Sequence, residues 1–320
     1  MKKLLTISMC VATLFMTACG NTQDTSNGSS KSTEISGEMT FGDYINSSGR
    51  KIFYQFSDDN FSKDTYIHRI SVIEDQQITS YAIEELTFAD LQSLSDDEII
   101  AKAKELHAQY VENKLEPELS GIKATVEHIE EVRSYTSNEQ DLYGELYASG
   151  TVFPLPIQEK FDAIENGEST ESITDILNTY TTYAQNIENS EEAIQELQQP
   201  SPTSYIIGMY TDDSGNKTQT EYLKFEALVF PGEYTFKEKR LTYDDYLESK
   251  PLKTIAMSSE KYFSGFINFI TEEVYDSTYL VAFNSDSEYV WATKTNGKLT
   301  LTLDQPDTKL KNIEIDAETE

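Results

Sequence analysis

Cysteine is almost absent from this sequence. Its 320 residues include two cysteines, Cys10 and Cys19. If the N-terminal leader that holds Cys10 is removed, one cysteine is left, which excludes an internal disulfide and a cysteine-based zinc or iron–sulfur site. A chain of about 300 residues does not need disulfides, because it is long enough to bury its own core.

Recognisable catalytic motifs are also missing. The three histidines, His68, His107 and His128, have no partner at metal-binding spacing, and we expect each to be an ordinary surface or boundary residue. The chain contains no Gly-x-Ser-x-Gly elbow and no phosphate-binding or dinucleotide-binding loop. These absences predict a protein that is not an enzyme and has no cofactor. They exclude no enzyme by themselves, because a catalytic triad is a spatial arrangement.

Long hydrophobic runs are absent as well. The longest, from Leu4 to Met16, is shorter than the roughly 20 residues that a transmembrane helix needs. It follows the basic pair Lys2-Lys3 and precedes the small residues Thr17-Ala18. A basic start, a short apolar core and small residues before the cleavage site are typical of a secretory signal peptide, which we assign to residues 1–18.

The residues around Cys19 resemble a lipobox, the lipidation signal of bacterial lipoproteins. The stretch reads Met16-Thr17-Ala18-Cys19-Gly20, and Met16 departs from the leucine usual at that position. The resemblance implies that Cys19 is the first mature residue and carries a diacylglycerol and palmitate-type anchor. Two or more acyl chains give stable attachment. We therefore expect a protein bound to the membrane through Cys19, on the outer face of the cytoplasmic membrane.

Positive charge is scarce. The chain has 56 acidic and 25 basic residues, for a net charge of −31. Such a field repels nucleic acid and anionic lipid, and it favours cationic partners. We expect no nucleic-acid partner, and a cationic peptide, a protein or a small molecule as ligand. The simpler interpretation is that the charge keeps an envelope protein soluble and away from its own anionic membrane.

The first half of the chain is predicted to contain a tether, a β-meander and helices. Residues 19–38 are polar and predict a disordered tether. Alternating stretches at 51–56, 65–74 and 77–83 predict strands, with a tight turn at Glu74-Asp75-Gln76. A capping box at Ser95-Asp96-Asp97-Glu98 predicts a helix that ends before Pro117. Further on, we expect strands at 123–132 and 142–147, and helices at 157–164 and 173–187. A break is expected at Asn189-Ser190, after which Ile194 and Leu197 continue the helical face to Pro200.

The second half is predicted to be mostly strand. Pro200-Ser201-Pro202 suggests a boundary, so we expect an α+β region at 39–200 and an antiparallel β domain at 201–320. Asn296-Gly297 is a strong type I′ hairpin signal. The fold class is therefore α+β, antiparallel and β-rich, with a barrel-like or sandwich-like C-terminal sheet and a helical segment between two β regions. The strands expected in this half lie at 205–211, 218–230, 234–239, 261–270, 278–284, 289–295, 298–303 and 310–315.

A short pattern recurs three times, in Thr40-Phe41-Gly42-Asp43, Thr87-Phe88-Ala89-Asp90 and Thr242-Tyr243-Asp244-Asp245. Threonine followed by an acid three residues later is a helix-capping pattern. Each copy is expected to start a short helix. An internal duplication is the less favoured explanation.

Acidic pairs are common and therefore say little about function. Asp212-Asp213-Ser214-Gly215-Asn216 supplies oxygen ligands and a glycine, but without the spacing of a calcium loop. We interpret this segment as a hairpin turn and keep Asp212, Asp213 and Asn216 as weak candidates for a cation or ligand site.

Several segments resemble uncharacterised surface lipoproteins of low-GC Gram-positive bacteria. Besides the lipobox, the similar patches are 49–54, 86–100, 210–218, 274–279 and 304–309. Residues 122–200 match nothing in that family. We treat them as a candidate insertion into one β-rich domain. The family has no established activity, and the resemblance implies only location and gross architecture.

The expected function is that of a non-enzymatic, membrane-anchored binding or interaction protein at the cell surface. One alternative is a small-ligand carrier with a barrel-like C-terminal domain. Another is an envelope hydrolase without a recognisable motif. A transporter's solute-binding protein ranks lower, because that fold alternates strands and helices along the chain, whereas this sequence segregates them.

Overall fold

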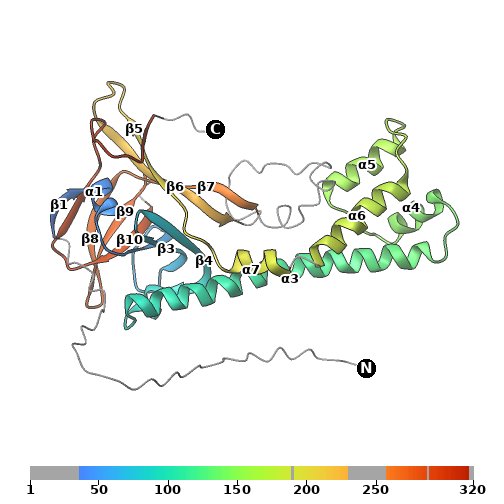
Figure 1. The fold of residues 1–320 in the computed structure, drawn as a ribbon, viewed down its shortest axis with the longest axis horizontal. Coiled ribbons are helices and arrows are strands. Elements are labelled where there is room, and N and C mark those ends of the chain that lie inside the picture. The colour runs from blue at the N-terminus through green and yellow to red at the C-terminus, as the bar shows by residue number, and fades with distance from the viewer. Residues whose placement is uncertain (1–35, 189–190, 230–256, 287, 317–320) are drawn as a thin grey trace, which may run out of the picture. The chain divides into compact units, whose positions relative to one another are not determined.

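The computed structural model describes residues 36–188, 191–229, 257–286 and 288–316. They form a mixed α+β fold in which six consecutive helices separate two sets of strands, as the sequence predicts (Figure 1). Residues Thr33–Glu320 make up one compact unit. The expected signal peptide and Cys19 lie outside the described residues. Strand β1 begins at Gly37, so the expected tether, 19–38, extends two residues too far.

A six-stranded antiparallel sheet forms the centre of the fold. Three strands from the N-terminal part of the chain form one half of the sheet and three from the C-terminal part form the other half. The halves join where β2 pairs with β10, which places Phe53 opposite Thr293. The predicted boundary at residue 200 is therefore wrong: residues 201–320 are not a separate domain. The strands, in spatial order, are β4 (Gln77–Thr87), β3 (Tyr66–Glu74), β2 (Lys51–Asp58), β10 (Tyr289–Thr295), β9 (Ser277–Phe283) and β8 (Asn268–Val274).

The predicted β-meander is confirmed. Strands β2, β3 and β4 pair in sequence, and Glu74 lies opposite Gln77 at the turn. Asp75 and Gln76 have φ angles of 51° and 60°. Positive φ at both central residues is the geometry of a type I′ turn, which matches the twist of the flanking strands.

A second sheet has four strands and a third has two. In the second, β12 (Ile313–Ile315) pairs with β5 (Tyr205–Thr211) in parallel, and β6 (Thr218–Val229) and β7 (Met257–Phe266) continue it antiparallel. In the third, β11 (Leu299–Thr302) pairs in parallel with β1 (Gly37–Thr40). The segment expected as one strand at 261–270 is thus divided between β7 and β8, and the strand expected at 234–239 lies outside the described residues.

The hairpin expected at Asn296-Gly297 does not form. Strand β11 pairs with β1 instead of returning along β10. Gly297 has a φ of 75°, and the Lys298 amide donates to Asn296 Oδ1 at 3.0 Å. The local turn chemistry is therefore present, but the N-terminal strand β1 supplies the pairing partner.

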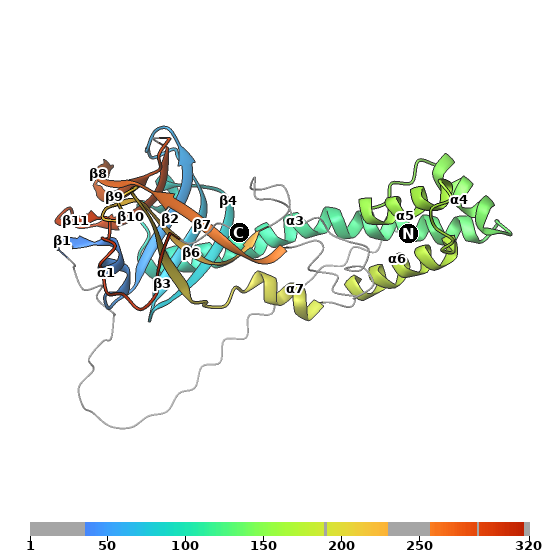
Figure 2. The ribbon, with the colours of Figure 1, turned by 90° about the horizontal axis from the view of Figure 1, so that it is seen from above.

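The two larger sheets face each other across an aromatic core. Phe41 of helix α1 (Phe41–Asn46) is completely buried and contacts the rings of Phe53, Phe266 and Trp291. Side chains of β5, β6 and β9 complete this core. The arrangement is the sandwich-like form of the expected fold. The other face of the six-stranded sheet packs against α2 (Phe88–Leu91) and the first turns of α3 (Figure 2).

The two described copies of the threonine pattern start helices, as predicted. Thr40 Oγ1 accepts from the Asp43 amide at 3.2 Å at the start of α1. The Thr87 amide donates to Asp90 Oδ2 at 2.9 Å at the start of α2. The third copy, at Thr242, lies outside the described residues.

Helix α3 (Asp96–Arg133) begins where predicted and continues much further than predicted. The Ser95 amide donates to Glu98 Oε2 at 2.8 Å and completes the capping box. The helix passes through Pro117, so the expected end before this proline is wrong, and so is the strand expected at 123–132. The apolar residues Ile122, Val126 and Ile129 recur at helical spacing and pack against neighbouring helices, a tertiary gain that outweighs the cost of an internal proline.

The strand expected at 142–147 is also helical. Helix α4 (Glu139–Ala148) is capped by Asn138, whose Oδ1 accepts from the Asp141 amide at 2.9 Å. Leu142 and Leu146, four residues apart, are both buried. A short apolar run fits a strand or a helix by pattern alone, and here burial of one helical face decides.

The remaining helices agree with the sequence prediction. They are α5 (Leu155–Glu165), α6 (Ile173–Glu188) and α7 (Glu191–Gln198). The expected break at Asn189-Ser190 lies outside the described residues. Helices α2 to α7 occupy the chain between β4 and β5, so the helical segment starts at Phe88, well before the residue 122 at which the candidate insertion was expected to begin. Within the described ranges, no helix is both long and apolar enough to cross a membrane.

Candidate functional site

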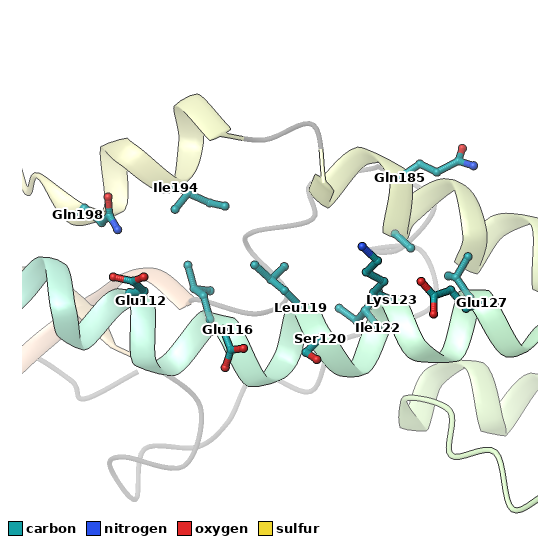
Figure 3. A pocket seen from close by; sticks show the side chains of 13 residues that line it. Glu112, Glu116, Leu119, Ser120, Ile122, Lys123, Glu127, Gln185, Ile194 and Gln198 are labelled. Carbon is teal, nitrogen blue, oxygen red and sulfur yellow. The ribbon is translucent and has the colours of Figure 1, made fainter. Parts of the chain in front are cut away.

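A cavity in the described part of the chain lies between α3, α6 and α7 (Figure 3). Its volume is about 810 Å³, within the range of roughly 300–1,000 Å³ that is typical of ligand sites. We call it the helix groove. Helices α6 and α7 each pack on α3 at a different point along its length, and the helix groove lies between these two contacts.

The floor of the helix groove is apolar. Leu115, Leu119, Ile122 and Val126 follow one another along α3 at spacings of three or four residues, so they lie on one face of the helix. Over these residues α3 rises by about 16 Å. Leu119, Ile122 and Val126 are only partly buried. The facing wall contributes Ala184 from α6 and Ile194 from α7.

The rim of the helix groove is charged and mostly acidic. Glu112, Glu116 and Glu127 line it, and Lys123 is the one basic residue among the described lining residues. All four are exposed. Figure 3 shows Glu112 beside Gln198 of α7, and Lys123 and Glu127 near α6. The groove thus combines an apolar surface with a net negative edge.

Two packing contacts hold the walls in place. Helix α6 buries Ile176, Leu177 and Tyr180 in the same core as Ile129 and Val132 of α3. Helix α7 is attached through Leu197, whose backbone oxygen lies 2.9 Å from His107 Nε2 on α3. Between these two attachments the part of the stripe from Leu119 to Val126 is only partly covered, and this is the origin of the groove.

His107 is a buried structural residue, so the expectation of a surface or boundary position is wrong. Its side chain is fully buried, its Nδ1 lies 3.1 Å from the Ala82 oxygen of β4, and its Nε2 lies against Leu197. Burial lowers its pKa below the ordinary value, and the two backbone contacts oppose that shift. The imidazole therefore joins α3, α7 and β4.

We expect His107→Ala to lower the free energy of unfolding by about 2–4 kcal/mol, because it removes a buried ring and the one N–H that the neutral imidazole donates to a buried carbonyl. The loss should shrink as pH falls below 6.5. In that range the unfolded wild type takes up a proton before the folded protein does, so the histidine contributes less to stability. Urea denaturation at pH 5 and pH 7.5 measures this.

The exposed Gln109, on the same helix and without a titratable group, provides the control for this measurement. Gln109→Ala should change the stability by less than about 0.5 kcal/mol. A wild-type and a His107→Ala profile that stay parallel between pH 5 and pH 7.5 would contradict the inferred titration.

One set of contacts resembles a catalytic triad, because an imidazole lies between a hydroxyl and a carboxylate. The residues are Ser149, His128 and Glu131. His128 lies on α3, not on a strand as expected. Its Nε2 is 2.8 Å from Ser149 Oγ, and its Nδ1 is 3.6 Å from a Glu131 carboxylate oxygen. Ser149 Oγ also donates to the Leu146 oxygen at 2.8 Å. The hydroxyl proton therefore points to the C-terminal end of α4, whose negative dipole disfavours an alkoxide, and we assign the contact to capping of α4.

The candidate cation residues Asp212, Asp213 and Asn216 lie in the turn between β5 and β6. Asp212 Oδ1 accepts from the Ser214 and Asn216 amides and from Ser214 Oγ, at 2.7–3.2 Å. These bonds, the one from Ser214 Oγ foremost, lower the pKa of Asp212. Its oxygens thus serve the turn, the interpretation that the sequence favoured. In the described ranges no three His, Cys, Asp or Glu side chains are placed to hold a metal ion.

A buried pair of carboxyl groups was not anticipated from the sequence. Glu221 on β6 and Asp304 after β11 are both fully buried. The Asp304 amide donates to Glu221 Oε2 at 3.1 Å, and the Gly42 amide donates to Asp304 Oδ2 at 2.6 Å. Burial first, and the Asp304 carboxyl second, raise the pKa of Glu221 well above its usual value. We infer that the pair holds one proton.

The residues of the helix groove were also missed, because the sequence prediction ended α3 at Pro117 and turned 123–132 into a strand. The signal was present in the spacing of Leu115, Leu119, Ile122 and Val126. Its continuation across the proline would have identified one helical face.

Searches against family models, curated proteins and solved structures found no match to this chain.

Proposed function

We propose that this protein is a lipid-anchored binding protein on the outer face of the cytoplasmic membrane, and that the helix groove is its ligand-binding site. The observation that carries the second part is the combination of a cavity of about 810 Å³ with an apolar floor and a polar rim. Ligand sites are typically concave and largely apolar, with a few polar groups that set orientation. The anchor rests on the lipobox around Cys19 and on the similarity to surface lipoproteins of low-GC Gram-positive bacteria.

The alternative function, a carrier that holds its ligand inside the C-terminal sheet, has less support than ligand binding in the helix groove. The C-terminal strands are distributed over three sheets, and the space between the two larger sheets is filled by aromatic and aliphatic side chains such as Phe41, Phe225 and Trp291. A filled interior has no room for an apolar ligand.

Replacement of Cys19 tests the anchor. We expect the wild-type protein in the membrane fraction and labelled by an alkyne fatty acid, and Cys19→Ala in the soluble fraction without label. The reason is that the acyl chains supply most of the membrane affinity of a chain whose charge of −31 is repelled by anionic lipid. A Cys19→Ala protein that still sediments with the membranes would refute lipid anchorage.

Nile red, a neutral dye that fluoresces in apolar surroundings, tests the groove. We expect saturable binding of one dye per chain. Leu119→Asp should abolish it, because a carboxylate would replace part of the apolar floor. Ala124→Asp adds the same charge to an exposed position of α3 outside the groove lining and should leave binding unchanged. Equal binding to both variants would place the dye elsewhere and exclude the groove as its site.

A further inference from the structure

We propose that the helix groove binds the apolar face of a cationic amphipathic helix from a partner protein. This inference rests on the proposed function, because it names the ligand class of the same site. Its first support is shape. The floor is a stripe on one face of α3 with apolar residues at i, i+4, i+7 and i+11, from Leu115 to Val126, and helix-in-groove recognition uses anchors with this same periodicity.

The second support is length. The stripe covers about 16 Å of α3, which corresponds to about three helical turns. A partner helix of two to three turns presents three or four large apolar side chains on one face. Leu119, Ile122 and Val126 are the partly buried side chains that these anchors would cover, while Ala184 and Ile194 bound the groove from the other side.

The third support is charge. Glu112 and Glu116 lie toward the α7 end of the stripe and Glu127 toward the α6 end, with Lys123 between them. Three exposed carboxylates against one ammonium make the rim negative as a whole, most of all toward α7, because Lys123 offsets Glu127 at the α6 end. The field of the whole chain, with a net charge of −31, has the same sign. A basic helix would approach faster than a neutral or acidic one and would gain ion pairs at the rim.

The probe is a 14-residue peptide of leucine and lysine, with leucine repeated at helical i, i+3, i+4 and i+7 spacing. A matched peptide has glutamate in place of every lysine. Fluorescence anisotropy of the labelled peptides with the full mature chain gives the affinities at low and high salt. We expect one lysine peptide per chain, weaker binding at high salt because the rim charges are exposed, and no binding of the glutamate peptide.

Two triple variants separate the rim from the general charge. The groove variant combines Glu112→Gln, Glu116→Gln and Glu127→Gln. The control combines Glu145→Gln, Glu168→Gln and Glu226→Gln, three exposed acids outside the groove lining. Both change the net charge by the same amount. The groove variant should weaken binding of the lysine peptide by about three- to thirty-fold, from three exposed charge pairs, and the control by less than about two-fold.

The outcomes are distinguishable from a failure of the proposed function. If Leu119→Asp abolishes binding of Nile red but the lysine peptide does not bind, the groove is a site for another ligand and the cationic helix is wrong. Equal weakening by the two triple variants, or equal binding of the glutamate peptide, would also overturn the proposal. If neither the dye nor the peptide binds the groove, both proposals fail.

Discussion

Glu221→Gln is expected to make the folded protein more stable than wild type at alkaline pH, with an advantage of about 1–3 kcal/mol at pH 9. Glu221 and Asp304 are both fully buried, and Glu221 Oε1 and Asp304 Oδ1 have no hydrogen-bond partner unless a proton lies in the pair. A buried carboxyl with a second carboxyl beside it resists ionisation. A glutamine side chain at this position is neutral at every pH, and its amide can donate to Asp304.

The sign of the pH dependence follows from proton binding. Burial raises the folded-state pKa of Glu221 well above its usual value. Between the ordinary and the raised pKa, the folded protein holds one more proton than the unfolded chain. The contribution of Glu221 is therefore complete below the ordinary pKa and is lost as pH rises through the raised one, by up to about 1.4 kcal/mol per pH unit.

Urea denaturation at pH 5, 7 and 9 measures this effect as the difference between the variant and wild type, so that other titrating groups cancel. Glu226→Gln is the matched control, because Glu226 lies on the same strand and is exposed. Its effect on the stability should be small beside that of Glu221→Gln at pH 9. If the stability difference between Glu221→Gln and wild type is the same at all three pH values, the folded protein does not keep a proton on this pair, and the inference is wrong.

Gly42→Ala is expected to lower the free energy of unfolding by about 2–4 kcal/mol, although alanine is the better helix former. An added Cβ at Gly42 would lie 2.3 Å from Leu310 Cδ1 and 2.5 Å from Asp304 Oδ2. Real Cβ atoms do not approach other heavy atoms so closely, so the Leu310 and Asp304 side chains would have to move. That movement would also lengthen the bond from the Gly42 amide to Asp304.

Gly144→Ala is the control for Gly42→Ala and is expected to raise the free energy of unfolding instead of lowering it. Gly144 lies inside α4 and is exposed, and an added Cβ would meet nothing within 4 Å. Here the helix propensity of alanine acts alone and should stabilise the protein by about 0.5–1 kcal/mol. Thermal unfolding followed by circular dichroism measures both variants. If the two alanines shift Tm in the same direction, the close approach at Gly42 is not what constrains that position.

The acid pair and Gly42 can also be tested together. Both variants act on Asp304, Gly42→Ala by displacing it and Glu221→Gln by removing its carboxyl neighbour. Residues that share a partner usually do not have additive effects. We expect the double variant at pH 9 to deviate from the sum of the single changes by more than about 0.5 kcal/mol.

Local patterns in the sequence predicted much of the secondary structure. Ser95 and Glu98 start α3, Thr40 and Thr87 start α1 and α2, and the residues at Asp75-Gln76 turn β3 into β4. Each of these depends on a few neighbouring residues and on backbone hydrogen bonds that the same residues satisfy. Such features are therefore readable without knowledge of the tertiary structure.

The sequence predictions were wrong where contacts between residues far apart in the chain determine the local structure. Pro117 is a helix breaker by local rules, yet α3 continues through it because Ile122, Val126 and Ile129 pack into the helical core. Asn296-Gly297 favours a hairpin, yet β11 pairs with β1, nearly the whole chain away. The boundary at Pro200-Ser201-Pro202 looked like a domain boundary, yet β2 and β10 are neighbours in one sheet.

By itself, the sequence of this protein determined the expectation of lipid anchorage at Cys19, the strong negative charge, the scarcity of thiol and histidine chemistry and the α+β class. These depend on composition and on short motifs. Only the tertiary structure decided that the sheets are built from both ends of the chain, that Glu221 and Asp304 share a buried site, and that α3, α6 and α7 leave a groove. The physical reason is that burial and pairing are set by residues far apart in the chain, whereas local patterns report only backbone preference.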